Sequence, residues 1–359
     1  MHFDLSPEHY QFQENIDRLL SDSVDLAAMT RGEDVIGPLR DTLDAAFADM
    51  GVGMVLAPEE TGGLQMGLLT LTCLADSLGR HAAPTSALNG AVAAWLVASS
   101  GDDRLIKQWL EPLLGGTTSV TFACNEAPGM WTPETSRSTS GDDIVTRHNV
   151  PDADTARLII APLADGLVFV DHAALQDCHA TPDPLDMTRP TGTVSFAPSK
   201  GIFIGPELTG PLYDALLILT AADAAGAGRR AFELTVDYAK TREQFGQPIG
   251  AFQGVKHQIA DMAVDIEPAK FLCWRAAQAW DAGAADASRY AALCKAHAAD
   301  VAVKTARAAV EVHGGIGYTW EYPLHLLLKR AMHDRITLGS PTLLRQRVAE
   351  YDALRTASS

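Results

Sequence analysis

The segment YAKTREQFGQPIGAFQ (residues 238–253) decides the fold, because it joins two long helical stretches through one tight bend. We expect the first helix to end at Arg242, glycine and proline to form the bend, and a second helix to begin near Phe252. The helix dipole stabilises a cation at this end, and the Arg242 guanidinium can form a fork of hydrogen bonds to a phosphate. Phe245 offers a flat apolar face beside it. The plainer alternative is that Arg242 only caps the helix and that Phe245 is buried in the core.

A second segment, EVHGGIGYTWEYP (residues 311–323), is rich in glycine. Its glycines allow tight turning and close approach of the backbone to a ligand, as dinucleotide-binding loops require. His313 precedes them and is placed to hydrogen-bond a phosphate or a ribose. The alternative is a helix C-cap followed by an ordinary loop, with His313 an ordinary loop histidine.

The rest of the chain divides into three regions. Residues 1–116 predict helices joined by short turns, with Ser6 as an N-cap and Gly79 as the stop signal of the helix over 64–78. Residues 117–206 predict a small β domain, and residues 207–359 a helical bundle, alanine-rich over 284–310. The expected strands lie in short β-branched runs at 119–123, 143–146, 157–161, 166–170 and 191–196.

Composition narrows the class of protein. The chain has 359 residues, 47% hydrophobic and 20% charged, which is typical of a globular protein of two or three domains. Its net charge of −17 disfavours nucleic acid and anionic membranes as partners. The five cysteines form no CxxC pair, and no signal peptide is visible, so we expect free thiols in the cytoplasm. The longest apolar stretch, 215–228, is interrupted by Asp223 and is too short to span a bilayer.

Together the two glycine-containing segments closely resemble the acyl-CoA dehydrogenase family. The segments APEETGG (57–63) and VPDADTA (150–156) are also similar to family segments, and all four occur in the family's order over nearly the whole chain. The resemblance implies a mainly α fold with an N-terminal helical domain, a middle β-barrel and a C-terminal four-helix bundle. It also implies dimers or tetramers that bind FAD at a subunit interface.

The resemblance further implies which residues contact FAD, mostly FAD whose ring lies in the neighbouring subunit. In this family the RxxFG arginine reaches the pyrophosphate, and the glycine-rich loop lies against the adenosine half. Family members usually carry Gln where this chain has Glu311, and an acid near a pyrophosphate is unfavourable unless a cation or a bound proton offsets it. The expected contacts are Arg242, Phe245, Gln253, Glu311, His313, Gly314, Gly315 and Gly317.

The positions of the catalytic base differ from the family pattern. In this family a carboxylate removes the α-proton of an acyl-CoA thioester while the flavin takes a hydride from the β-carbon. Most members carry that Glu just before a glycine after the glycine-rich loop, where this chain has Leu338. Others carry it on the helix before RxxFG, where this chain has Leu216, followed by Leu217 in place of a substrate-binding Arg. Asp214 is expected to be a solvated surface acid on another helix face.

The middle region also differs from the family pattern. The family turn that holds the flavin ring corresponds to residues 123–131, where the small hydroxyl residues are lost and the bulky Met130 and Trp131 appear. A core or interface position suits Trp131 better than stacking on a flavin. Some bacterial members of the family are α2β2 heterotetramers with two flavins and one type of catalytic subunit, and this chain resembles their subunit without a base. The segments TWE (319–321) and LKR (328–330) are similar to members that act on steroid side-chain CoA thioesters.

The main hypothesis is therefore a cytoplasmic subunit that completes the FAD site of a homologous catalytic partner acting on a bulky acyl-CoA. An electron-transfer flavoprotein is the expected electron acceptor. One alternative is a self-sufficient homomeric enzyme that uses Asp214 or a loop acid as its base, and another is a structural homologue without flavin. No metal site is expected, because His325 and His333 lack an acidic neighbour at ligand spacing. The absence of a G-x-S-x-G segment argues against a nucleophilic hydrolase.

Overall fold

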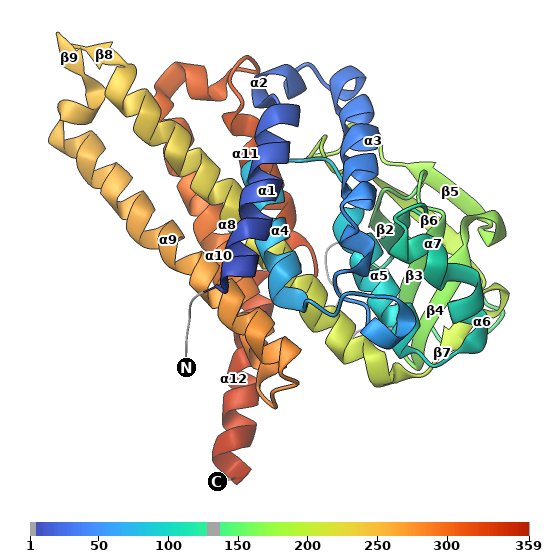
Figure 1. The fold of residues 1–359 in the computed structure, drawn as a ribbon. Helices are drawn as coiled ribbons and strands as arrows, with labels where there is room; N and C mark the ends of the chain where they lie inside the picture. The colour runs from blue at the N-terminus through green and yellow to red at the C-terminus, as the bar shows by residue number, and fades with distance from the viewer. Residues whose placement is uncertain (1–4, 128–136, 359) are drawn as a thin grey trace.

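The computed structural model describes residues 5–127 and 137–358, and its elements follow the expected order of helices, strands and helices (Figure 1). Ser6 caps the first helix by accepting a hydrogen bond from the amide of His9 at 3.4 Å, as predicted. The region boundaries after 116 and 206 stay predictions. The first helices are α1 (Pro7–Ser23), α2 (Leu26–Met29), α3 (Glu33–Asp49), α4 (Leu68–Arg80), α5 (Ala87–Ser99), α6 (Asp103–Leu105) and α7 (Glu111–Leu114).

The middle region forms two separate sheets in the described residues, so the expectation of a closed barrel is wrong. One sheet has the strand order β1-β3-β4-β7 and the other β2-β6-β5, and apolar side chains of both fill the space between them. A sequence of alternating apolar residues fits a two-sheet sandwich as well as a barrel, which is why the sequence did not separate them. The strands are β1 (Val120–Phe122), β2 (Val145–Pro151), β3 (Leu158–Leu163), β4 (Gly166–Asp171), β5 (Asp177–Ala180), β6 (Thr191–Phe196) and β7 (Ile202–Ile204).

The C-terminal helices form the expected bundle, with α8, α9, α10 and α11 packed on one another and the end of α12 projecting from it (Figure 1). None of the helices within 5–127 and 137–358 is both long and apolar enough to cross a bilayer. The elements are α8 (Thr209–Thr241), the hairpin β8 (Glu243–Gln244) and β9 (Gln247–Pro248), α9 (Gln253–Asp281), α10 (Ala287–His313), α11 (Leu324–Ile336) and α12 (Pro341–Ser358).

Helix α4 crosses α8 at a point where the two backbones touch. A Cβ atom on Gly79 would lie 2.0 Å from the carbonyl oxygen of Asp223, and one on Gly226 would lie 2.0 Å from that of Asp76. Gly79 is therefore not the predicted stop signal, since α4 continues to Arg80. Its glycine permits close helix packing instead.

Candidate functional site

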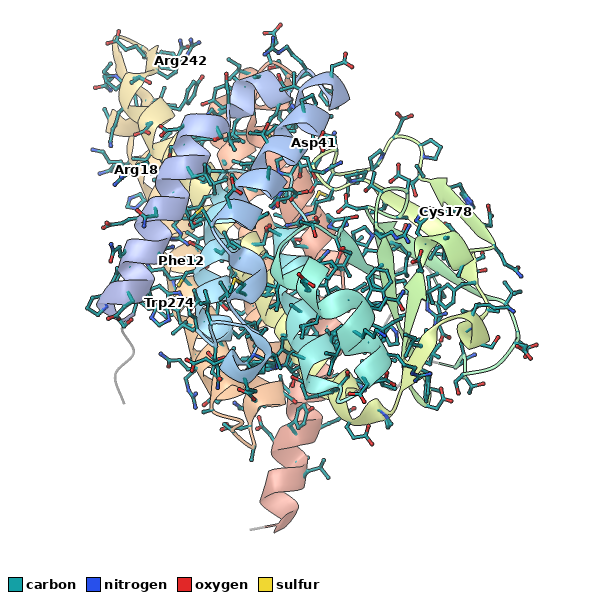
Figure 2. All side chains as sticks on the ribbon, turned by 45° about the vertical axis from the view of Figure 1, so that its right-hand side comes forward. Phe12, Arg18, Asp41, Cys178, Arg242 and Trp274 are labelled. Carbon is teal, nitrogen blue, oxygen red and sulfur yellow. The ribbon has the colours of Figure 1, made fainter. Side chains whose placement is uncertain are left out.

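Arg242 lies at the C-terminus of α8, as the sequence predicts. It is the C-cap residue, and its amide donates to the carbonyl oxygen of Tyr238 at 2.8 Å. Its own carbonyl oxygen accepts from the amide of Ile249 at 2.8 Å, which closes the bend. The side chain is exposed on the side of the molecule away from the sheet that carries Cys178 (Figure 2). The guanidinium is therefore accessible to an anionic ligand.

Phe245 occupies the tip of the β8–β9 hairpin. Phe245 has φ +53° and Gly246 has φ +78°, so the two-residue loop has the backbone of a type I′ turn, which usually carries Asn or Gly. The Phe245 ring is 93% exposed and touches only the edge of Phe252, with ring centroids 6.1 Å apart. The alternative of a core position for Phe245 is therefore wrong. A strained, exposed aromatic side chain favours a role in binding.

The glycine-rich segment continues directly from α10 as the short 3₁₀ helix η9 (Gly314–Tyr318). Gly314 has φ +62°, and a Cβ on Gly314 or Gly315 would meet no atom within 4 Å, so both glycines border open space. Gly317 is different, because a Cβ there would lie 2.7 Å from the carbonyl oxygen of Val310. Gly314 and Gly315 allow a ligand to approach the backbone, whereas Gly317 is needed for packing.

His313 is buried and faces the protein interior. Its Nδ1 lies 2.7 Å from the carbonyl oxygen of Ala309 and its Nε2 lies 3.1 Å from the hydroxyl of Tyr322. The ring stacks on Tyr238 at 4.2 Å, and burial lowers the pKa of His313. His313 thus joins the last turns of α8 to the glycine-rich segment, which places Arg242 near the glycines.

Glu311 and Gln253 complete the same surface. Gln253 is exposed at the start of α9, and Gln258 one turn further donates to Glu311 Oε2 at 3.2 Å. Glu311 also borders a groove of about 530 Å³ whose lining includes Lys304, Arg307 and Arg335. Of these cations, Lys304 pairs with Asp265 and Arg335 with Asp300, and the hydrogen bond from Gln258 is the contact that the structure gives to Glu311 among the described residues. We name this surface the exposed rim and define it as Arg242, Phe245, Gln253, Glu311, Gly314 and Gly315.

The two leucines at the expected base positions line one cavity. The cavity has a volume of about 150 Å³ and lies between the middle sheets and the bundle. Leu216 on α8 and Leu338 after α11 both border it, and Tyr213 fixes the second by donating to the Leu338 carbonyl oxygen at 2.8 Å. We name this cavity the cleft. Its other lining residues include Leu88, Phe122, Cys124, Asn125, Asn149, Asp152, Arg189, Asp223, His333, Asp334 and Thr337.

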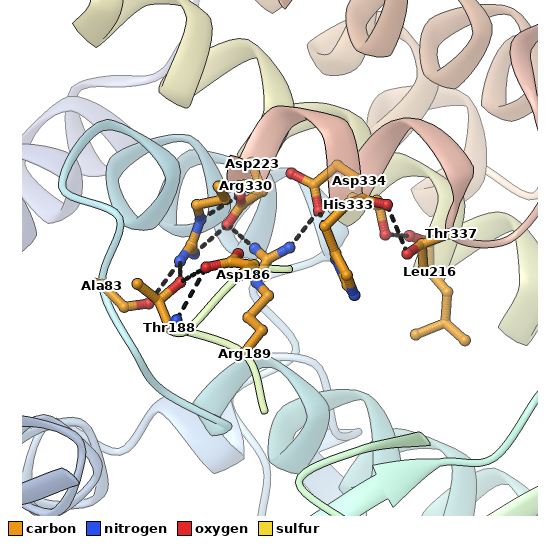
Figure 3. Close-up of polar contacts among 11 residues, drawn as sticks. Ala83, Asp186, Thr188, Arg189, Leu216, Asp223, Arg330, His333, Asp334 and Thr337 are labelled. Carbon is orange, nitrogen blue, oxygen red and sulfur yellow. Dashed lines mark hydrogen bonds and ion pairs between the residues drawn. The ribbon is translucent and has the colours of Figure 1, made fainter. Parts of the chain in front are cut away.

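Three acids border the cleft, and two of them are in close ion pairs. Asp223 accepts two hydrogen bonds from Arg330, at 2.8 and 2.7 Å, and lies 2.5 Å from Arg189 Nη2. Burial disfavours the charge on Asp223, but Arg189 and Arg330 outweigh burial and lower its pKa. Asp334 pairs with Arg189 Nη1 (Figure 3). The third acid is Asp152.

Asp152 is the least tightly held of these acids. Burial raises its pKa to about 6, and Arg40 opposes this shift from 4.0 Å. Asp214 is in a different place and is not the solvated acid that we expected. It is 4% exposed inside the bundle and accepts a hydrogen bond from the hydroxyl of Ser288. Asp214 does not line the cleft, which agrees with its position on another face of α8.

The exposed rim and the cleft lie at opposite ends of α8. Leu216 and Arg242 are 26 residues apart on this helix. At 1.5 Å per residue they are separated by about 39 Å along the axis, which is longer than an extended dinucleotide. One FAD molecule therefore cannot contact the rim and the cleft of the same chain.

The two regions also differ in their fit to FAD. The rim offers an exposed guanidinium, an exposed aromatic ring and two glycines beside open space, which suit the pyrophosphate and adenosine half. The cleft has a volume of about 150 Å³ and is bordered by leucines at the two expected base positions. Met130 and Trp131, which we expected near the ring side, lie outside the described residues.

Sequence reasoning missed the charged cluster beside the cleft. Arg330 and Asp334 lie one turn apart on α11, whereas Arg189 lies in the connection between β5 and β6, and only the fold brings them together around Asp223 on α8. Asp223 did give a signal, since it interrupts the longest apolar stretch of the chain. A charged residue in a buried helix requires a charged or hydrogen-bonding partner.

Comparisons with known proteins identify the family. Residues 6–117 match the N-terminal domain of acyl-CoA dehydrogenases, and residues 218–351 match the C-terminal domain. The chain is 31% identical over 293 residues to acyl-CoA dehydrogenase IpdE2 of Mycolicibacterium smegmatis, covering 81% of each chain.

Solved structures share the whole fold. A variant of the steroid acyl-CoA dehydrogenase Tcur3481-Tcur3483 is 27% identical with a TM-score of 0.83, covering 98% of this chain and 99% of that one. A chain of the ChsE4-ChsE5 complex from Mycobacterium tuberculosis is 22% identical, with the same TM-score and coverage. The chain therefore belongs to the acyl-CoA dehydrogenase family, whose members are FAD-dependent oxidoreductases that act on acyl-CoA thioesters.

Proposed function

We propose that this chain is the subunit without a catalytic base in a heteromeric FAD-dependent acyl-CoA dehydrogenase. Its exposed rim completes the FAD site of a homologous catalytic subunit, in an α2β2 assembly. The observation that carries the proposal is that Leu216 and Leu338, at the two positions where the family carries its base, both line the cleft. Neither side chain can accept the α-proton of a thioester.

The rim residues have separate tasks in this proposal. The Arg242 guanidinium binds the pyrophosphate, and Phe245 packs against the adenosine half. Gly314 and Gly315 let the backbone approach the ligand, while buried His313 holds the glycine-rich segment against α8. When bound, FAD accepts the hydride from the β-carbon of the acyl group. The chain itself contributes binding and orientation.

The separation of the rim from the cleft supports a site shared between subunits. The rim is exposed and about 39 Å from the cleft of its own chain. It can therefore contribute only to a flavin whose ring lies in another subunit. The lining of the cleft supports the same proposal, since Leu216 and Leu338 leave it without a carboxylate at either expected base position.

The substrate class is part of the proposal. One similar structure is described as a steroid acyl-CoA dehydrogenase and another as a complex of two ChsE proteins. Together with the TWE and LKR segments, these descriptions favour a bulky, steroid-derived acyl-CoA thioester as substrate of the assembly. An electron-transfer flavoprotein would then reoxidise the flavin in the cytoplasm.

One observation favours the homomeric alternative. Asp152 borders the cleft, and its pKa of about 6 is suitable for a general base near neutral pH. In that case the chain alone would bind one flavin per subunit and oxidise an acyl-CoA. Changing Asp152 to Asn would then abolish the reaction.

Flavin stoichiometry separates the proposals. The chain is purified alone and after co-expression with homologous subunits encoded nearby, and flavin absorbance is compared with protein concentration. We expect no flavin and no activity from the chain alone, and one flavin per pair of subunits in an active complex. Yellow, active protein from this chain alone would refute the proposal and support the homomeric enzyme. A complex without flavin would support a structural role.

A further inference from the structure

The connection between β5 and β6 leaves the sheet and reaches the helical bundle. This segment, residues 181–190, begins with exposed residues and then becomes buried, with Asp186 and Thr188 each 1% exposed. Asp186 Oδ1 stabilises its turn by accepting from the amide of Thr188 at 2.9 Å and from its hydroxyl at 2.7 Å. We name residues 181–190 the strap.

The strap is attached to two helices of the bundle. Arg189 Nη2 lies 2.5 Å from Asp223 on α8, and its Nη1 pairs with Asp334 on α11. The hydroxyl of Thr188 accepts from Arg330 on α11 at 3.0 Å (Figure 3). One short segment is therefore held by two of the helices that border the cleft.

Arg330 extends the attachment to the N-terminal helices. Its Nη1 also donates to the carbonyl oxygen of Ala83, in the connection from α4 to α5, at 3.1 Å. Its Nε and Nη2 bind both oxygens of Asp223. Parts of all three regions thus meet around one buried guanidinium.

The burial of this cluster shows that water does not reach most of its charges. The side chains of Asp223, Arg330 and Asp334 are 0–3% exposed, whereas that of Arg189 is 23% exposed and borders the cleft. Charges buried to this extent hold a fixed geometry only while every partner is present. Arg189 is thus the most exposed member of the cluster and the charged side chain through which the strap binds α8 and α11.

We propose that the strap is a closing device, fastened through Arg189, that holds the polar end of the cleft shut. Losing the Arg189 ion pairs releases the strap from α8 and α11 and opens the cleft to solvent and to small solutes. This inference concerns the cleft of this chain alone and requires neither a partner nor an activity.

Cys124 offers a reporter inside the cleft. It borders the cavity and is buried, and burial raises the pKa of its thiol to about 12. A thiol in water has a pKa of about 8.5, so opening the cleft increases the reactive thiolate fraction by up to about a thousandfold near pH 8. Cys73, Cys273 and Cys294 are buried elsewhere and serve as internal standards.

The experiment measures alkylation of each cysteine by N-ethylmaleimide in the full chain, in whichever assembly it purifies, by peptide mass spectrometry. In Arg189→Met we expect Cys124 to react at least about tenfold faster than in the wild type, with the three standards unchanged. Hydrogen exchange of the 181–190 amides should increase in parallel. Arg157→Met is the matched control, because Arg157 makes a surface ion pair with Asp171 on the same sheets.

A second variant keeps the proposal testable if the single variant does not fold. Arg189→Met combined with Asp334→Leu removes both partners of one pair, leaves no unpaired buried charge from it, and keeps the Arg330–Asp223 pair. Acceleration at Cys124 in this variant supports the proposal, even if the single variant is too unstable to purify. If Cys124 is alkylated at the wild-type rate in the folded variant, and the strap amides exchange hydrogen at the wild-type rate, the proposal is wrong.

Discussion

The two ends of helix α8 have opposite properties. At the C-terminal end, Arg242 and the hairpin tip are exposed, and the glycines beside them border open space. Towards the N-terminal end, Asp223 is enclosed by two arginines next to a small cavity. In our proposals the first end binds a flavin held mainly by another subunit, and the second stays closed. A single helix therefore connects a surface suited to binding with a region suited to stability.

The difference shows that family resemblance does not assign the same role to every part of a chain. The rim keeps the residue types that anchor a dinucleotide. The cleft has leucines at the two positions where we expected a carboxylate, and a buried charged cluster lies beside it. Function must be argued separately for each site.

The largest effect is expected from breaking the cluster at the closed end. Asp223→Asn leaves Arg189 and Arg330 without a common counter-charge and should lower the free energy of unfolding by about 3–5 kcal/mol. Urea unfolding measures this change. The double variant Asp223→Leu with Arg330→Met should lower the free energy of unfolding clearly less. If both variants lower the free energy of unfolding equally, packing rather than charge stabilises this end of the helix.

The next effect is expected at the open end. Arg242→Ala should weaken retention of FAD in the assembly by about ten- to a hundredfold, because a charge-assisted hydrogen bond contributes about 1.5–3 kcal/mol. Flavin titration of the complex measures the affinity, and urea unfolding should show little change because the side chain is exposed. Lys240→Ala, two residues earlier on α8, is the control. Unchanged flavin affinity in Arg242→Ala would remove the rim from the cofactor site.

A pH-dependent effect is expected near the closed end. Lys295 on α10 is fully buried, and its Nζ has no hydrogen-bond partner among the described residues. Burial lowers its pKa to about 8, and Asp334 opposes this shift. The unfolded chain therefore binds more protons between pH 8 and 10.5, so the group makes stability rise with pH in that window. In Lys295→Met, the gain in unfolding free energy over wild type should shrink by about 2 kcal/mol from pH 7 to pH 9.5. A constant difference would show that Lys295 stays charged in the folded protein up to pH 9.5, as it does in the unfolded chain.

The smallest effect is expected at the hairpin tip. Phe245→Asn places a residue that favours type I′ turns where an aromatic side chain now has φ +53°. It should raise the free energy of unfolding by up to about 1 kcal/mol while weakening the retention of flavin. Thermal unfolding and flavin titration test the two effects separately. A loss of stability would show that the exposed ring packs within its own chain.

Much of the fold followed from the sequence. The apolar periodicity predicted the helical regions, and the β-branched runs predicted five of the strands. Strands β5 and β7 were missed: the residues of β5, Asp177–Ala180, are mostly exposed and do not alternate, and β7 has only three residues, Ile202–Ile204. The predictions of a closed barrel and of Gly79 as a helix stop signal were wrong for a common reason, since both features depend on how distant elements pack. Local sequence does not encode that packing directly.

The same contrast between local features and distant contacts applies to the candidate site. Arg242 and the glycines were found from motifs, because a helix end and a tight turn are local features. The inward orientation of His313 was not foreseen, since it depends on Tyr238 and Tyr322. The strap was missed because its partners are more than thirty residues away along the chain.

The crossing of α4 and α8 limits how this molecule can move. At Gly79 and Gly226 the two backbones are in direct contact, and the crossing lies at the level of Asp223. A rotation or a slide of one helix against the other would drive carbonyl groups into the opposing backbone. Helices α4 and α8 are consequently fixed in one relative position at this crossing, so we expect opening of the interior to displace the two sheets before it shifts these helices.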